Sequence, residues 1–172
     1  MYQVGDYVVY GGSGVCQVDG VGAPSSSGCD SGRAYYTLHP LSGTETIYVP
    51  VDTHVSMRPV LTRQEADELI LRLPSLPEYP VDREARNPQL LSHAYQASFR
   101  ANSCTELARL LKTIHRKDAD ARRTGRQPGR MDERYRKRAE ELLYRELSVA
   151  LGIPRDGVPK YIRQRLQSGG PD

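Results

Sequence analysis

The chain has 172 residues, of which 38% are hydrophobic and 26% are charged, a composition that suits one medium or two small water-soluble domains. No apolar run is long enough to span a bilayer, no basic stretch and apolar core mark a secretory signal, and three cysteines without C-x-x-C spacing argue against a disulfide scaffold and a zinc ribbon. Residues 1–81 carry four basic and nine acidic side chains (net −5), whereas residues 82–172 carry twenty and twelve (net +8), which suggests two different partners, one of them polyanionic.

Short β-type runs recur in the first 59 residues, separated by Gly, Ser, Pro and Asp. They lie at 7–10, 14–18, 34–38, 44–49 and 55–58. The glycine cluster at 11–14 lacks the Lys-Ser/Thr of a phosphate loop and the glycine spacing of a nucleophile elbow, so it is interpreted as a turn. Five short strands at this spacing predict a small barrel or curled sheet.

The apolar spacing changes from β-type to helical after residue 60. Thr62 and Glu65 form a predicted capping box at the start of a helix, which we expect to complete a first domain over residues 1–73. Three prolines then fall within residues 74–81. Because proline cannot continue a helix, this segment is predicted to be a stiff, extended linker.

Everything beyond the linker has helical periodicity, which predicts an all-α helical bundle over residues 82–167. Asn87-Pro88 begins one helix, and Ser103 with Glu106 forms a second predicted capping box. Residues 122–130 contain two glycines and a proline and interrupt the helices. A longer helix runs from about residue 132 to a stop at Gly152, a short amphipathic piece follows at 158–162, and residues 168–172 are expected to be a disordered tail. The predicted fold class is therefore α+β with two domains.

No arrangement of side chains predicts catalysis. The four histidines are scattered without metal-ligand spacing, and the carboxylates lie beside Arg or Lys on predicted helices, as on solvated helix faces. We therefore expect a protein that is not an enzyme and that has no metal or cofactor.

The basic half suits contact with phosphates, which asks for clustered Lys and Arg rather than a base-reading motif. A highly charged, solvated helix pair is the alternative explanation. The candidate DNA-binding cations are Arg116, Lys117, Arg122, Arg123, Arg126, Arg130 and Arg134.

Several stretches together resemble the CarD-like bacterial transcription regulators, whose amino-terminal domain the transcription-repair coupling factor (TRCF) shares. In the first half these are GDYVVYGGSGVCQV, YYTLHP, TETIYVPVD and MRPVLTRQEADELILRL; in the second they are LARLLKTIHRKDADARR and ERYRKRAEELLYRELSVALGIPRDGVPKYI. The resemblance implies a Tudor-like barrel that binds the β subunit of bacterial RNA polymerase. It also implies a helical domain that contacts the minor groove and phosphates of promoter DNA and stabilises the open complex.

The resemblance also implies which residues make these contacts. Polymerase contact falls on the exposed face of the hairpin strands, here Arg33, Tyr35, Glu45, Ile47 and Tyr48. Well-known members insert a tryptophan into the minor groove, but this chain has no Trp, and the equivalent spacing before Tyr95 leads to Leu91. Leu91 is either an apolar wedge or, from its helical spacing with Tyr95 and Phe99, part of the core.

The sequence thus predicts a cytoplasmic, nucleoid-associated monomer that regulates transcription by binding RNA polymerase and promoter DNA. A protein-interaction adaptor that binds polymerase without binding DNA is the alternative.

Overall fold

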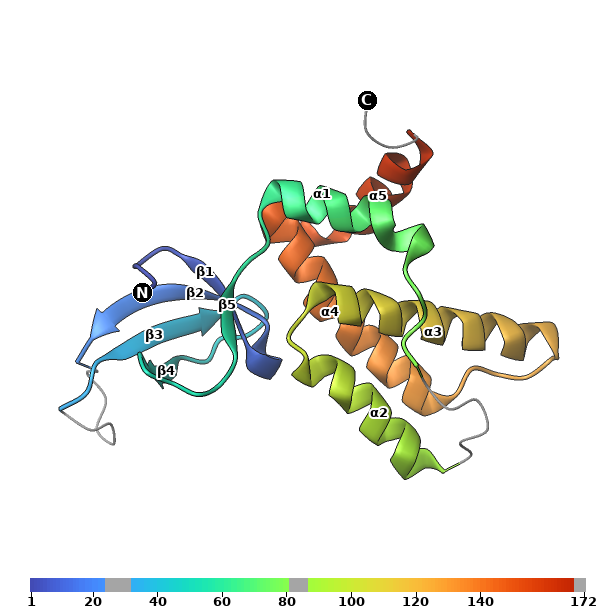
Figure 1. Cartoon of the computed structure of the whole chain (residues 1–172), viewed down its shortest axis with the longest axis horizontal. Coiled ribbons are helices and arrows are strands. Elements are labelled where there is room, and N and C mark those ends of the chain that lie inside the picture. The colour runs from blue at the N-terminus through green and yellow to red at the C-terminus, as the bar shows by residue number, and fades with distance from the viewer. Residues whose placement is uncertain (24–31, 81–86, 169–172) are drawn as a thin grey trace. The chain divides into compact units, whose positions relative to one another are not determined.

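The computed structural model describes residues 1–23, 32–80 and 87–168. The chain forms two compact units, Met1–Val60 and Leu61–Asp172, the first made of strands and the second of helices (Figure 1). An α+β architecture in two parts is therefore confirmed. Two arginines and five acidic residues give the first unit a net charge of −3, and twenty-two basic and sixteen acidic residues give the second +6.

The first unit is a five-stranded antiparallel sheet with the strand order β4-β3-β2-β1-β5. Its strands are β1 Tyr7–Tyr10, β2 Val15–Gly22, β3 Tyr35–Pro40, β4 Ile47–Pro50 and β5 Met57–Pro59. The edge strands β4 and β5 do not pair with each other within the described residues. The sheet is open there, so a closed Tudor-like barrel is not confirmed.

The glycine cluster after β1 is a turn, as the sequence predicts. Residues Gly11–Ser13 form one turn of 3-10 helix, and Gly11 and Gly14 have φ angles of +47° and +71°, which glycine adopts without a steric penalty. The turn returns the chain into β2, with Val8 opposite Cys16. One face of the sheet carries the core of this unit, whose buried members are Val8, Cys16, Val18, Tyr36, Leu38 and Val49.

In its described residues the second unit contains five α-helices (Figure 1), which share one apolar core. They are α1 Arg63–Arg72, α2 Pro88–Arg100, α3 Cys104–Arg123, α4 Arg130–Leu151 and α5 Val158–Gln167. Two short 3-10 helices, Leu73–Ser75 and Arg155–Gly157, follow α1 and precede α5.

Three predicted helix ends have the expected chemistry. The Glu65 N–H donates to Thr62 Oγ1 and the Thr62 N–H to Glu65 Oε2, at 3.1 and 2.8 Å, which completes the capping box of α1. The Gln89 N–H donates to Asn87 Oδ1 at 2.9 Å and caps α2. Gly152 ends α4 with φ +68°, the left-handed conformation that glycine favours there.

The capping box predicted at Ser103 is wrong. Ser103 precedes α3, but its side chain makes no capping hydrogen bond. Its expected partner is engaged elsewhere: the Glu106 carboxylate accepts two hydrogen bonds from Arg109, at 3.0 and 3.2 Å. An ion pair one turn along α3 therefore replaces the reciprocal cap.

The division between the units differs from the predicted boundary at residues 73/74, because α1 belongs with the helices. Ala66, Leu69 and Ile70 are buried in the same core as the leucines of α3 and α4. Periodicity in α1 identifies an apolar face but carries no information about which core buries that face.

The proline-rich segment, for which the sequence predicts a stiff, extended linker, packs against the helical unit. Leu76 is 6% exposed and belongs to the helical core. The Lys112 ammonium donates to the carbonyls of Leu73, Pro74 and Leu76 at 2.7–3.3 Å. The Leu73 carbonyl also accepts from the Leu76 N–H at 3.3 Å, and Lys112 supplies a donor to the Pro74 and Leu76 carbonyls.

Parts of some predictions lie outside the described residues: position 81 of the linker, 82–86 of the helical domain, 169–172 of the tail, and Cys29. Within the described residues, none of the helices combines the length and the apolar character needed to cross a membrane.

Candidate functional site

The pairing of β3 with β4 creates a tyrosine-bearing face on the sheet. Thr37 lies opposite Tyr48, and Tyr35 lies opposite Pro50. Because side chains alternate along a strand, Tyr35, Thr37 and Tyr48 share the face opposite to the one formed by Tyr36 and Leu38. Tyr48 is half-buried and Tyr35 is 9% exposed, so Tyr48 is the more accessible of the two.

Ile47 points to the other face. It lies opposite Leu38 and packs against the core of the first unit. The structure therefore separates Ile47 from Tyr48, although the sequence predicts both as contact residues. Strand alternation is the signal that distinguishes them.

Arg33 and Glu45 are exposed residues that precede β3 and β4. The Arg33 guanidinium donates to both carboxylate oxygens of Asp52 at 3.0 Å, and this hydrogen bonding lowers the pKa of Asp52 below its usual range. The Glu45 side chain lies against Gly43 in the turn between the strands. Arg33 and Glu45 thus flank the tyrosine-bearing face at its two loop ends.

The same alternation adds a residue that the resemblance does not indicate. Tyr7 is 40% exposed and lies opposite Gln17, which lies opposite His39. Tyr7, Gln17 and His39 therefore lie on the same face as Thr37 and Tyr48, because His39 follows Thr37 by two residues on β3. The signal in the sequence is an aromatic residue at the start of a β-type run, at the position before Val8.

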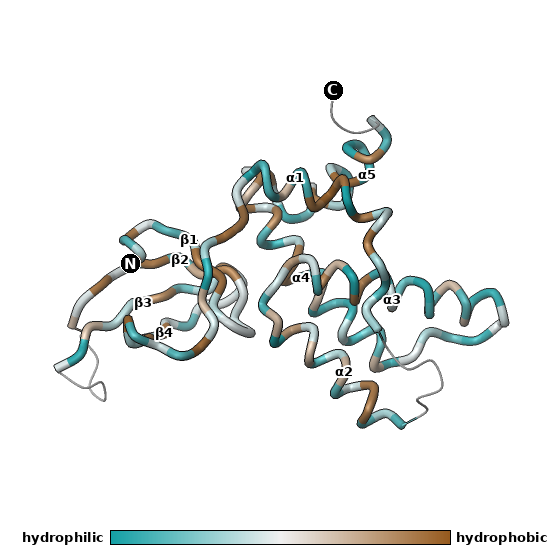
Figure 2. The backbone as a smooth tube through the Cα atoms, viewed as in Figure 1, coloured by the Kyte–Doolittle hydropathy of each residue, from teal (hydrophilic) through white to brown (hydrophobic). Residues whose placement is uncertain are grey.

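The basic residues of the second unit gather where α3 is joined to α4. Figure 1 shows the two helices running antiparallel with a short connection at one end, and Figure 2 shows that hydrophilic residues dominate that end. Gly125 has φ +75°, the Gly125 N–H donates to the Arg122 carbonyl, and the Arg126 N–H donates to the Ala121 carbonyl, at 3.1 and 2.7 Å. This Schellman arrangement fixes the backbone that presents the cations.

Three of the seven predicted DNA-binding cations have carboxylate partners. Arg116 donates to Glu78 at 2.7 Å and to Asp120 at 3.3 Å, and the hydrogen bond to Glu78 raises the pKa of Arg116. Arg123 donates to the same Asp120 at 2.7 Å, but its side chain remains 77% exposed.

Lys117 is part of a buried polar cluster. Its ammonium lies 2.9 Å from Asp132 Oδ2 and donates to the Tyr95 hydroxyl at 2.9 Å, and that hydroxyl donates to Asp132 Oδ1 at 2.6 Å. Burial, and then the bond to Asp132, raise the pKa of Tyr95. The cluster joins α2, α3 and α4, so Lys117 has a structural role.

The other four cations are exposed and, within the described residues, have no carboxylate within 4 Å. The Arg126 guanidinium donates to the Thr124 hydroxyl at 3.1 Å, and that of Arg134 lies 5.6 Å from the centre of the Tyr135 ring. Arg122 and Arg130 complete the set. We call Arg122, Arg126, Arg130 and Arg134 the hairpin-tip arginines.

Two adjacent leucines in the first turn of α2 differ in their exposure to solvent. Leu91 is half-buried and packs against the helical core, whereas Leu90 is 61% exposed. The structure therefore favours the core assignment for Leu91. Leu90 is the apolar side chain presented to solvent. The sequence did not indicate it, because the spacing before Tyr95 selects Leu91 instead.

Comparison with known families identifies the first unit. Residues 2–61 match the model of the CarD-like/TRCF RID domain, a span that nearly coincides with the compact unit Met1–Val60. No curated protein matches the chain. The first unit therefore belongs to the CarD-like/TRCF RID domain family, which is related to transcription and to interaction with RNA polymerase.

Proposed function

We propose that the chain is a non-enzymatic transcription regulator that binds the β subunit of bacterial RNA polymerase through its first unit. The family match over residues 2–61 carries this proposal. The tyrosine-bearing face supports it, because tyrosine is enriched at the centres of protein interfaces. Tyr48 is the central contact residue in this proposal; Tyr7 shares its face of the sheet, and Arg33 lies just before β3.

The second unit contacts paired promoter DNA without reading its base sequence and stabilises the open complex. The hairpin-tip arginines support this part, because exposed guanidinium groups without carboxylate partners are available to phosphates. Leu90, rather than Leu91, supplies an apolar contact to the minor groove, because it is the exposed member of the pair.

A polymerase adaptor that does not bind DNA is the second candidate. It is favoured by the ion pairs of Arg116, Lys117 and Arg123, which reduce the number of cations available to phosphates.

Salt dependence of duplex binding by the full chain separates the two candidates. Each phosphate contact contributes a log–log slope of about −0.9 on B-form DNA, so Arg122→Ala with Arg130→Ala should flatten the slope by roughly two units. Lys160→Ala is the control, because Lys160 is an exposed cation on α5. The absence of measurable, salt-dependent affinity for duplex DNA would support the adaptor.

A further inference from the structure

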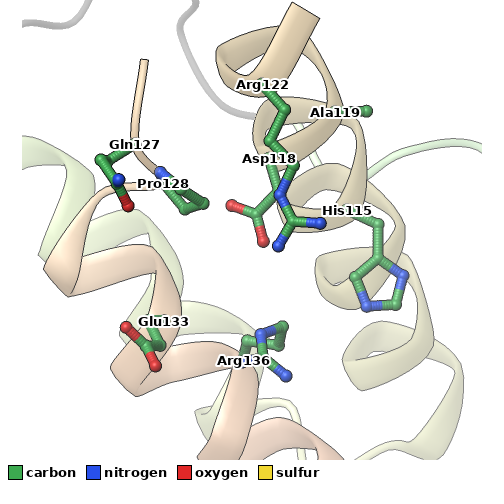
Figure 3. A pocket seen from close by; sticks show the side chains of 8 residues that line it. All are labelled: His115, Asp118, Ala119, Arg122, Gln127, Pro128, Glu133 and Arg136. Atoms are coloured by element: carbon green, nitrogen blue, oxygen red, sulfur yellow. The ribbon is translucent and has the colours of Figure 1, made fainter. Parts of the chain in front are cut away.

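The α3–α4 hairpin encloses a hollow next to the hairpin-tip arginines. Its volume is about 600 Å³, and it lies between the last turns of α3, the connection before α4 and the first turns of α4 (Figure 3). Its lining residues are His115, Asp118, Ala119, Arg122, Gln127, Pro128, Glu133 and Arg136. The space is large enough for a ligand the size of one nucleotide.

The lining carries both signs of charge. Arg122 and Arg136 supply guanidinium groups, and Asp118 and Glu133 supply carboxylates (Figure 3). Arg136 donates to Glu140 at 3.3 Å, but Arg122 has no carboxylate within 4 Å in the described part of the chain. A simple anion would meet the two carboxylates as well as the arginines, so the hollow favours a ligand that has hydrogen-bond donors in addition to negative charge.

The Asp118 carboxylate contains an acceptor that such a donor would satisfy. Its Oδ1 is shielded from solvent and has no hydrogen-bond partner within the described residues, an arrangement that costs stability. Arg122 lies one helical turn after Asp118 on the same face of α3. Figure 3 shows the Arg122 guanidinium beside the Asp118 carboxylate in the hollow, so the two groups can meet different parts of one ligand.

We propose that this hollow binds a single nucleotide, with the phosphate at Arg122 and Arg136 and an amino group of the base at Asp118. A carboxylate accepts from the N4 amine of cytosine, and Ala119 and Pro128 offer apolar surface to a base ring. The source is an unpaired nucleotide in DNA, which rests on the proposed DNA binding; a free nucleotide has the same chemistry and is distinguished below.

The test measures binding of the full chain to three labelled duplexes by fluorescence anisotropy at one fixed salt concentration. One duplex is fully paired, one carries a single unpaired deoxycytidine, and one carries an unpaired deoxyuridine, which lacks the amine. We expect deoxycytidine to bind about tenfold more tightly than deoxyuridine, the effect of one hydrogen bond to a charged group. Asp118→Ala should abolish this preference. Asp156→Ala is the control and should retain the preference for deoxycytidine, because this substitution removes the same negative charge from a fully exposed site.

The outcomes separate the inference from the proposed function. Equal, salt-dependent binding of all three duplexes would overturn the nucleotide site and leave the DNA-binding proposal intact. No binding to any duplex would contradict DNA binding, and deoxycytidine monophosphate would then be titrated while the His115 imidazole signal is followed by NMR. A shift that Asp118→Ala removes supports the hollow as a site for free nucleotides, and no shift overturns it.

Discussion

The exchange of Lys117 for methionine should destabilise the second unit rather than weaken DNA binding. Lys117→Met keeps most of the aliphatic stem but removes the ammonium that contacts Asp132 and the Tyr95 hydroxyl. The Asp132 side chain is 8% exposed and that of Lys117 is 30% exposed. The Asp132 carboxylate would then remain buried with the Tyr95 hydroxyl but without a positive charge.

The magnitude lies between two limits. Exposed ion pairs contribute about 0–1 kcal/mol, whereas breaking a fully buried pair costs about 3–5 kcal/mol. Because one partner is buried and the other is half-buried, we expect a loss of about 2 kcal/mol in the free energy of unfolding. For a domain of roughly a hundred residues this lowers the Tm by about 8–16 °C.

Two measurements on the full chain check this prediction. Urea unfolding followed by circular dichroism at the helical signal reports stability, and the salt slope of duplex binding reports phosphate contacts. The control is Arg122→Met, which should leave stability within about 0.5 kcal/mol and flatten the slope by about one unit. A Lys117→Met variant of unchanged stability with a flatter slope would refute the structural role of Lys117.

Three further predictions concern single side chains. Ile47→Ala should cost about 1–3 kcal/mol in thermal unfolding of the first unit, because Ile47 is only partly buried against the core; unchanged stability would contradict its inward orientation. Burial raises the pKa of the Cys16 thiol to about 11, so alkylation at pH 8 should require unfolding, and rapid labelling of the folded chain would contradict this. Since the folded-state pKa of Tyr95 is raised, the unfolded chain loses that proton first above about pH 10 and stability should fall there; Tyr95→Phe should make this fall shallower, and an identical profile would contradict the assignment.

Local chemistry made several elements of the fold predictable. The β-branched and aromatic run Tyr7-Val8-Val9-Tyr10 and the glycines after it identify β1 and its turn with correct bounds. The reciprocal side-chain bonds of Thr62 and Glu65 depend on residues three positions apart, so a short window of sequence contains them. The left-handed stop at Gly152 depends on a single residue.

Long-range partners explain what the sequence did not predict. The sequence predicts a linker for the proline-rich segment because the contact that holds this segment on the helical unit comes from Lys112, which lies 36 residues after Leu76. The sequence predicts that Lys117 is available to phosphates, because its acidic partner Asp132 lies on the next helix and is not evident from the sequence. Charge counting identifies a basic unit, but only the fold separates cations paired with carboxylates from those that remain available to phosphates.

The candidate contact face of the sheet was partly predictable. The resemblance to CarD-like regulators indicates β3 and β4, but it assigns Ile47 and Tyr48 together. Alternation along β4 already assigns these neighbours to opposite faces. Which of the two faces the core becomes clear only from the partner strand, where Ile47 lies opposite the buried Leu38 and Tyr48 lies opposite Thr37.

Binding of the full chain to the host's core RNA polymerase tests the central claim most directly. Immobilised wild type should retain the purified enzyme, and Tyr48→Arg should reduce retention at least tenfold, the effect of disrupting a central aromatic contact, while the circular dichroism spectrum stays unchanged. Lys160→Ala, in the other unit, should retain polymerase as wild type does. Equal retention by wild type and Tyr48→Arg would contradict the assigned face, and no retention by folded wild type would contradict polymerase binding itself.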